Sequence, residues 1–214
     1  MNRIEPADQA GVRRANLALL VRLLREHGAL SRAQLAVRSG LSKATVSSLV
    51  TDLERRGLVD TAGVVAGGQG RPGRPVRLRS AGACGIGLEV HVGHVGVLVT
   101  SLAGDASRYR RIACDVPAVG PERALDLLAE LASEALAARP GSLGPPAGLT
   151  VSVPGLVHTG AGAVTLAPRL RWRDVAVADG LAARTGVPLE RITVDNDANL
   201  ATVAELAELA ELAE

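Results

Sequence analysis

The segments SRAQLA, residues 31–36, and GLSKATVS, residues 40–47, decide the fold of the first part of this chain. Ser31 precedes Gln34 by three residues, the spacing of a capping box, so a helix is expected to begin there. The glycine that opens the second segment ends this helix, and Ser42 is a suitable cap for the next one. Two short helices joined by a tight glycine turn predict a helix-turn-helix.

The helix that follows Ser42 has two different faces. Its apolar residues recur at helical spacing and predict a buried stripe of Val46, Leu49, Val50 and Leu53. Its outward residues are short hydrogen-bonding groups and one cation, which suit base edges and phosphates in a DNA major groove. The candidate DNA contacts of the motif are Ser31, Arg32, Ser42, Lys43, Thr45, Ser47 and Ser48. An ordinary solvated helix face is the alternative interpretation.

The flanking sequence extends the motif to a winged helix. Apolar residues at helical spacing predict a helix over residues 12–27, and two short strands are expected at 58–60 and 76–78. The loop between the strands contains two Gly-Arg-Pro units, in which proline holds the backbone extended and glycine permits close approach. Arg71 and Arg74 are therefore expected to enter a narrow minor groove. A flexible domain linker is the alternative.

The charge distribution agrees with a DNA-binding first part. The formal charge of the chain is +2, but residues 1–80 carry 14 Arg or Lys against 6 Asp or Glu, and residues 81–214 carry 10 against 16. A basic domain joined to an acidic one fits a head that binds a polyanion and a body that does not.

Composition excludes several other classes of protein. Apolar residues make up 47% of the chain, which is typical of a globular protein. The start lacks the apolar stretch of a signal peptide, and the longest apolar run is far too short to span a bilayer. Cys84 and Cys114 are isolated, so two reduced thiols in a cytoplasmic protein are expected. No metal and no cofactor are predicted.

The second part of the chain reads as mixed strand and helix. Strands are expected at residues 85–90, 95–102, 108–116, 148–153 and 191–195, and helices from Pro121, over 175–185 and over 198–214. This order of three strands, helix, strand, helix, strand and helix is that of one lobe of the ribonuclease-H-like fold, which actin-like ATPases and sugar kinases use. The fold class is therefore α/β with an N-terminal winged helix-turn-helix, divided into a disordered arm (1–11), the winged helix (12–80) and the lobe (81–214).

The chain resembles the ROK family (repressor, open reading frame, kinase) of transcriptional regulators. The resemblance rests on the helix-turn-helix segments, the Gly-Arg-Pro loop, and three further motifs: VPGLV (153–157), APRLRW (167–172) and VDNDAN (194–199). It implies sugar contacts at Pro154, Gly155, Asn196 and Asp197, with the aspartate acting as general base in the kinases of the family. The alternative for Asn196 and Asp197 is a plain helix cap.

Two departures from the family pattern change what the resemblance implies. The family's kinases carry Asp-x-Gly-Gly-Thr at the first hairpin, where glycines let the backbone approach ATP phosphates. This chain has EVHVGH at residues 89–94, so ATP use is not expected, and neither is a metal site at His91 and His94.

The second departure concerns length, because a family member also continues into a second lobe. The last residues, 204–214, form a three-residue repeat that maintains no coiled-coil seam. The second lobe is expected to be absent from this chain, and the first lobe alone offers half of a sugar cleft. Sugar binding is therefore expected to be weak or absent.

Three hypotheses follow from these observations. The first is a non-enzymatic ROK-type repressor tied to carbohydrate metabolism, which binds double-stranded DNA. Its sensing of a sugar or sugar-phosphate effector is expected to be incomplete in this chain, and homo-oligomers are expected for the intact family. The second is an ATP-dependent sugar kinase with an appended DNA-binding head. The third is a non-functional fragment with an unstable acidic half.

Overall fold

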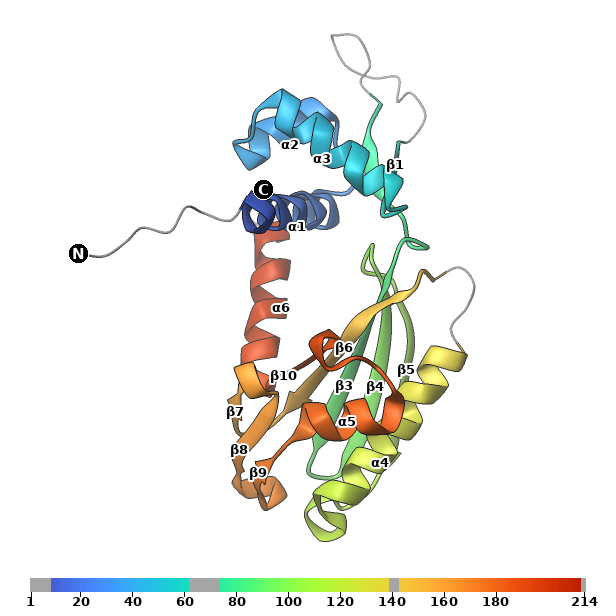
Figure 1. The fold of residues 1–214 in the computed structure, drawn as a ribbon, viewed down its shortest axis with the longest axis vertical. Coiled ribbons are helices and arrows are strands. Elements are labelled where there is room, and N and C mark those ends of the chain that lie inside the picture. Colours follow the sequence, from blue (N-terminus) through green and yellow to red (C-terminus); the bar gives the residue numbers. More distant parts are fainter. Residues whose placement is uncertain (1–8, 62–73, 139–142, 213–214) are drawn as a thin grey trace, which may run out of the picture.

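The computed structural model describes residues 9–61, 74–138 and 143–212, with the side chains of 106–107 and 205–212 left undescribed. A small helical head, residues 9–78, stands above a larger α/β lobe, residues 84–212 (Figure 1). Each has a hydrophobic core of its own, built almost entirely from leucine, valine and alanine. Aromatic residues make up only 1% of the chain, and many aliphatic side chains fill the two cores in their place.

The head consists of three helices and a two-stranded sheet. Its elements are α1 (Gln9–His27), α2 (Arg32–Ser39), α3 (Lys43–Arg55), β1 (Val59–Thr61) and β2 (Val76–Leu78). The two strands pair antiparallel, as expected for a winged helix. Helix α1 begins at Gln9, so residues 9–11 are helical and do not belong to the predicted arm. The remainder of that arm lies outside the described residues.

The turn between α2 and α3 forms as the sequence predicts. Gly40 ends α2 in the left-handed region, with φ 69°, a conformation that favours glycine. The predicted stripe on α3 is buried: Val46, Leu49, Val50 and Leu53 are each at most 1% exposed. The helix-turn-helix is confirmed.

The lobe is built on a five-stranded sheet in the order β10-β6-β3-β4-β5. The strands are β3 (Cys84–His91), β4 (His94–Ser101), β5 (Ala106–Ala113), β6 (Pro146–Val153) and β10 (Ile192–Asn196). Strands β6 and β10 run parallel to β3, whereas β4 and β5 form an antiparallel meander. This is the strand arrangement that the ribonuclease-H-like interpretation requires.

Three helices complete the lobe. Helices α4 (Val116–Ala137) and α5 (Val177–Thr185) contact each other beside the sheet. Helix α6 (Asp197–Leu212) leaves the end of β10 and rises to the head, where it contacts α1 (Figure 1). Helix α4 contains a kink at Gly120, with φ 75°, so the predicted start at Pro121 is the start of its second, longer segment.

The structure adds a second small sheet that the sequence patterns do not predict. Strands β7 (Leu156–His158), β8 (Ala163–Ala167) and β9 (Trp172–Val175) form an antiparallel unit beside β10. Short 3-10 helices, η1 (Thr159–Ala161) and η2 (Pro168–Leu170), separate them. Strands of three to five residues are too short for their alternation of polar and apolar side chains to be recognised. In the described part of the chain, no helix has the length and apolar character needed to cross a membrane.

Candidate nucleic-acid interface

The N-termini of α2 and α3 are held by side-chain caps. The Ser31 Oγ accepts a hydrogen bond from the Gln34 N–H at 3.2 Å, and the Gln34 Oε1 accepts one from the Ser31 N–H at 2.9 Å, which completes the predicted capping box. The Ser42 Oγ accepts from the Thr45 N–H at 3.1 Å and lies 2.9 Å from the Thr45 hydroxyl. The start of α3 is thus fixed before any ligand is bound.

The predicted contact residues of α3 form an open polar face. Lys43, Ser47 and Ser48 are exposed, and Thr45 is half-buried beside its cap. The opposite face of the helix is the buried stripe, so the exposed residues point away from the head core. A short, polar and rigid helix face of this kind has the shape and chemistry that a major groove accepts.

Arg32, also predicted to contact DNA, has a partner within the head. Its guanidinium donates to the Glu54 Oε1 at 3.0 Å, and the same carboxylate oxygen accepts from the Thr61 hydroxyl at 2.5 Å. These bonds connect α2, α3 and β1. Arg32 therefore stabilises the arrangement of the head, and a contact with phosphate would have to replace or share the Glu54 bond.

A buried carboxylate that the sequence patterns did not reveal joins α1 to α3. Asp52 is 4% exposed and accepts hydrogen bonds from Arg55 at 2.6 Å, Arg13 at 3.0 Å and Arg56 at 3.2 Å. The bonds from Arg55 and Arg56, helped by Arg13, hold the pKa of Asp52 well below its usual range. The patterns could not show this because Arg13 is 39 residues away in the sequence.

Asp52→Asn is therefore expected to destabilise the head at neutral pH, because three arginines would surround a neutral amide. The folded-state pKa lies below that of the unfolded chain, about 4. The stabilising contribution is thus present above that pH and is lost as the pH falls below it. Thermal melts that follow α3 amide signals should show a lower midpoint for the variant at pH 7 and a smaller difference at pH 3.

Asp60→Asn is the matched control for this prediction, because Asp60 forms an exposed ion pair with Arg77, at 2.7 Å, and such pairs contribute little. Equal midpoints for the wild type and Asp52→Asn at pH 7 would contradict the role assigned to Asp52.

The wing is described only at its base. The predicted minor-groove residue Arg71 lies outside the described residues, whereas Arg74 is exposed two residues before β2. On the strand itself Arg77 pairs with Asp60 across the two-stranded sheet, and this bond raises the pKa of the guanidinium. Within the described residues Arg74 forms no ion pair, so its charge is available to a polyanion.

The four predicted sugar-contact residues lie together where β6 and β10 end. The Asn196 amide donates from Nδ2 to the Gly155 carbonyl at 2.7 Å, while its Oδ1 accepts from the N–H groups of Ala198, at 2.9 Å, and Asn199, at 3.3 Å. Asn196 thus caps α6, as the alternative interpretation predicted, and ties α6 to the turn after β6. Asp197 is exposed in the first turn of α6.

Gly155 has a conformation that its motif requires. Its φ is 149°, and a Cβ at this position would lie 2.6 Å from the Leu166 carbonyl oxygen. The turn that follows Pro154 therefore presses against β8, and any larger residue would displace it. Proximity of Gly155 and Asn196 at the carboxyl ends of parallel strands is the placement at which α/β folds bind ligands.

The hairpin between β3 and β4 carries two imidazoles and a carboxylate. The His91 and His94 ring centroids are 4.7 Å apart, and the His94 Nε2 lies 3.4 Å from the Glu89 Oε2. These side chains occupy the hairpin at which the family's kinases have glycines. Among the described residues, no group of three or more His, Cys, Asp or Glu is arranged to hold a metal ion.

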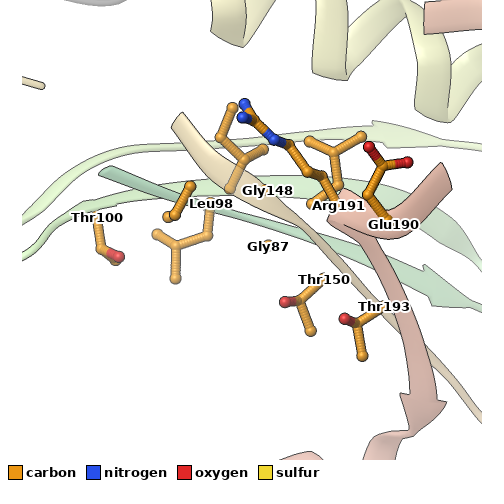
Figure 2. Close-up of a pocket in the computed structure, with 12 residues that line it drawn as sticks. Gly87, Leu98, Thr100, Gly148, Thr150, Glu190, Arg191 and Thr193 are labelled. Atoms are coloured by element: carbon orange, nitrogen blue, oxygen red, sulfur yellow. The ribbon is translucent and has the colours of Figure 1, made fainter. Parts of the chain in front are cut away.

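A groove of about 480 Å³ lies elsewhere on the sheet, at the amino ends of β3, β6 and β10. Figure 2 shows the Thr150 and Thr193 side chains next to each other on neighbouring strands, with Gly87 and Gly148 nearby and Arg191 at the rim. The groove is at the opposite end of these strands from Asn196. It is therefore separate from the predicted sugar residues, and no sequence pattern pointed to it.

Fold and site together define a two-part protein, in which a winged helix-turn-helix precedes one lobe of ribonuclease-H-like fold. Residues 86–212 match the ROK family and residues 10–71 match the MarR family. The first match covers more than half of the chain, so the chain belongs to the ROK family, and the resemblance seen in its motifs is confirmed.

Several known proteins are similar to this chain. It is 31% identical over 194 residues to a protein of Caldicellulosiruptor sp. (strain Rt8B.4) provisionally named a xylose repressor, a match that covers 90% of this chain and 47% of the relative. It is 29% identical over 198 residues to the xylose repressor of Bacillus subtilis (strain 168), a match that covers 90% of this chain and 49% of that repressor.

A solved structure confirms the fold. The crystal structure of a ROK family transcriptional regulator, a homologue of the E. coli MLC protein, matches with a TM-score of 0.64 and 22% identity over 87% of this chain and 46% of that one. The chain therefore spans about half the length of the relatives it matches.

Proposed function

We propose that this chain is a sequence-specific DNA-binding transcription regulator, a repressor tied to sugar metabolism. The observation that carries the proposal is the capped helix α3, whose exposed face presents Lys43, Ser47 and Ser48. The named xylose repressors among its relatives support the repressor role and the link to a sugar.

The head residues would divide the task of recognition. Lys43, Thr45, Ser47 and Ser48 on α3 would contact base edges and nearby phosphates in the major groove, with Ser31 and Arg32 at the start of α2 and Ser42 at the cap contacting the backbone. Arg71 and Arg74 would enter the adjacent minor groove. Two copies on a two-fold symmetric operator would place their heads on half-sites about 34 Å apart, or a multiple of this distance.

The lobe would supply one side of a sugar-binding cleft, and a sugar is expected to bind this chain alone weakly or not at all. Pro154, Gly155, Asn196 and Asp197 lie together at the ends of β6 and β10. The exposed Asp197 carboxylate, whose Oδ1 accepts a hydrogen bond from the Ala198 N–H at 2.9 Å, would accept further hydrogen bonds from sugar hydroxyls. Because Asn196 is already bonded to Gly155 and to α6, its part would be to hold this arrangement together. The side chains of His91 and His94 in the β3–β4 hairpin give no support to ATP-dependent phosphorylation.

Fluorescence anisotropy tests the proposal. The chain is titrated onto labelled DNA from upstream of its own gene and onto shuffled DNA of the same composition, over a series of salt concentrations. Tighter binding to the natural sequence, weakening steeply as salt rises, is the expected result. Equal binding to both DNAs would refute sequence-specific regulation, and no binding at low salt would refute DNA binding altogether.

A further inference from the structure

The head and the lobe meet where three chain segments stack backbone against backbone. These are the turn after α3 (Gly57 and Leu58), the connecting segment 79–83, and the segment before β6 that contains Gly144. A Cβ on Gly82 would lie 2.9 Å from the Gly57 carbonyl oxygen, and a Cβ on Gly144 would lie 2.4 Å from the Ala83 nitrogen. The segments approach so closely that only glycine fits at the two positions.

The lobe also contributes side chains to the core of the head. Leu102 and Ala103, in the connection between β4 and β5, pack against the head cluster that contains Leu20 and Leu53. The Leu102 N–H donates to the Ala83 carbonyl at 2.9 Å. On the other side of this connection, a Cβ on Gly104 would lie 3.6 Å from the Arg25 Nε of α1.

A carboxylate binds this connection to the segment that leads out of the head. The Asp105 Oδ2 accepts from the Ser80 hydroxyl at 3.0 Å and from the Ser101 hydroxyl at 3.1 Å, and the Asp105 N–H donates to the Ser101 Oγ at 3.1 Å. Ser101 is 4% exposed, so its bonds are shielded from water. Polar and apolar contacts therefore act at the same junction.

We infer that head and lobe form one rigid body, and that Leu102, Ala103 and the stacked glycines are positioning residues that set the orientation of α3 relative to the lobe. A connection made of segment 79–83 alone would let the head rotate independently. Because the junction is packed, any rotation or shift of the lobe moves α3 by the same rotation or shift. The positioning of α3 for DNA binding rests on the proposed function, whereas the rigidity of the junction does not depend on it.

Backbone ¹⁵N relaxation of the full chain measures the rigidity directly. In the wild type, amides of the head and of the lobe are expected to give a single rotational correlation time. Gly144→Ala should force the stacked segments apart, and Leu102→Ala should remove the apolar contact. In both variants the rotational correlation time of the head amides should become shorter than that of the lobe amides, because the head would tumble faster than the lobe.

Gly93→Ala is the matched control, because a Cβ there meets no atom within 4 Å and the common correlation time should survive. Emission from the buried Trp172 confirms that the lobe is folded in each variant, and Leu102→Ala carries the test if Gly144→Ala does not fold. Different correlation times for head and lobe in the wild type would overturn the inference, and so would a common value in folded Leu102→Ala. A rigid wild-type chain that binds no DNA would refute the proposed function alone.

Discussion

Removing both wing arginines, Arg71→Ala with Arg74→Ala, is expected to weaken DNA binding and to flatten its salt dependence by about 2 units of slope in a plot of log K against log salt. Each arginine that neutralises a phosphate releases close to one counterion, so the loss of two contacts should appear as this difference. Anisotropy titrations between low and moderate salt give the slope for the wild type and the variant.

The matched control removes two arginines of the lobe, Arg108→Ala with Arg111→Ala. Both side chains are exposed on β5, and the change in net charge is the same. The control should leave the slope near that of the wild type, because β5 lies on the lobe, beyond the junction. An unchanged slope for the wing variant would mean that the two arginines contact no phosphate. An equal loss of slope in the control would mean that they act only through overall charge, and either result would refute their entry into the groove.

Trp172→Ala is expected to destabilise the lobe by about 3–5 kcal/mol, the usual cost of truncating a fully buried large aromatic side chain. Trp172 is 1% exposed and is the largest of the fully buried side chains. Urea denaturation followed by circular dichroism measures the effect, since the variant lacks the single tryptophan of the chain. If head and lobe unfold in one transition, its midpoint should move to a lower urea concentration. If they unfold separately, the midpoint of the lobe transition should move in this way.

Trp172→Phe separates the packing of the indole from its polar group. Among the buried side-chain polar atoms that the structure describes, the Trp172 Nε1 has no hydrogen-bond partner. Replacement by phenylalanine removes this N–H without orphaning an acceptor, so it should cost much less than alanine. Leu156→Ala, at an exposed position of β7, should change little. A loss as large for Trp172→Phe as for alanine would show that the indole N–H has a partner, such as a buried water.

Local signals account for what the sequence predicted well. The boundaries of α2 and α3 follow from Ser31, Ser42 and Gly40, each of which acts on residues at most three positions away. The buried stripe of α3 follows from helical periodicity alone. The cap formed by Asn196 was recognisable for the same reason, because its partners Ala198 and Asn199 are adjacent in sequence.

Contacts between distant segments account for what the sequence did not show. Nothing near Asp52 identifies Arg13 as its partner, and nothing near Arg32 identifies Glu54. The hydrogen bond from the Asn196 side chain to the Gly155 carbonyl, in contrast, spans 41 residues and depends on two parallel strands ending side by side. Such pairings follow from the tertiary arrangement, which neither periodicity nor capping can specify.

Helix α6 reaches the head at a second place, away from the junction of stacked glycines (Figure 1). It begins at the cap formed by Asn196 and extends 16 residues, about 24 Å at 1.5 Å per residue, before it reaches α1. A rod of this length, tilted by about 5° at its base, moves its far end by roughly 2 Å. A rotation of a few degrees between head and lobe would therefore break the contact between α6 and α1, so this contact exists only while the two parts keep one orientation.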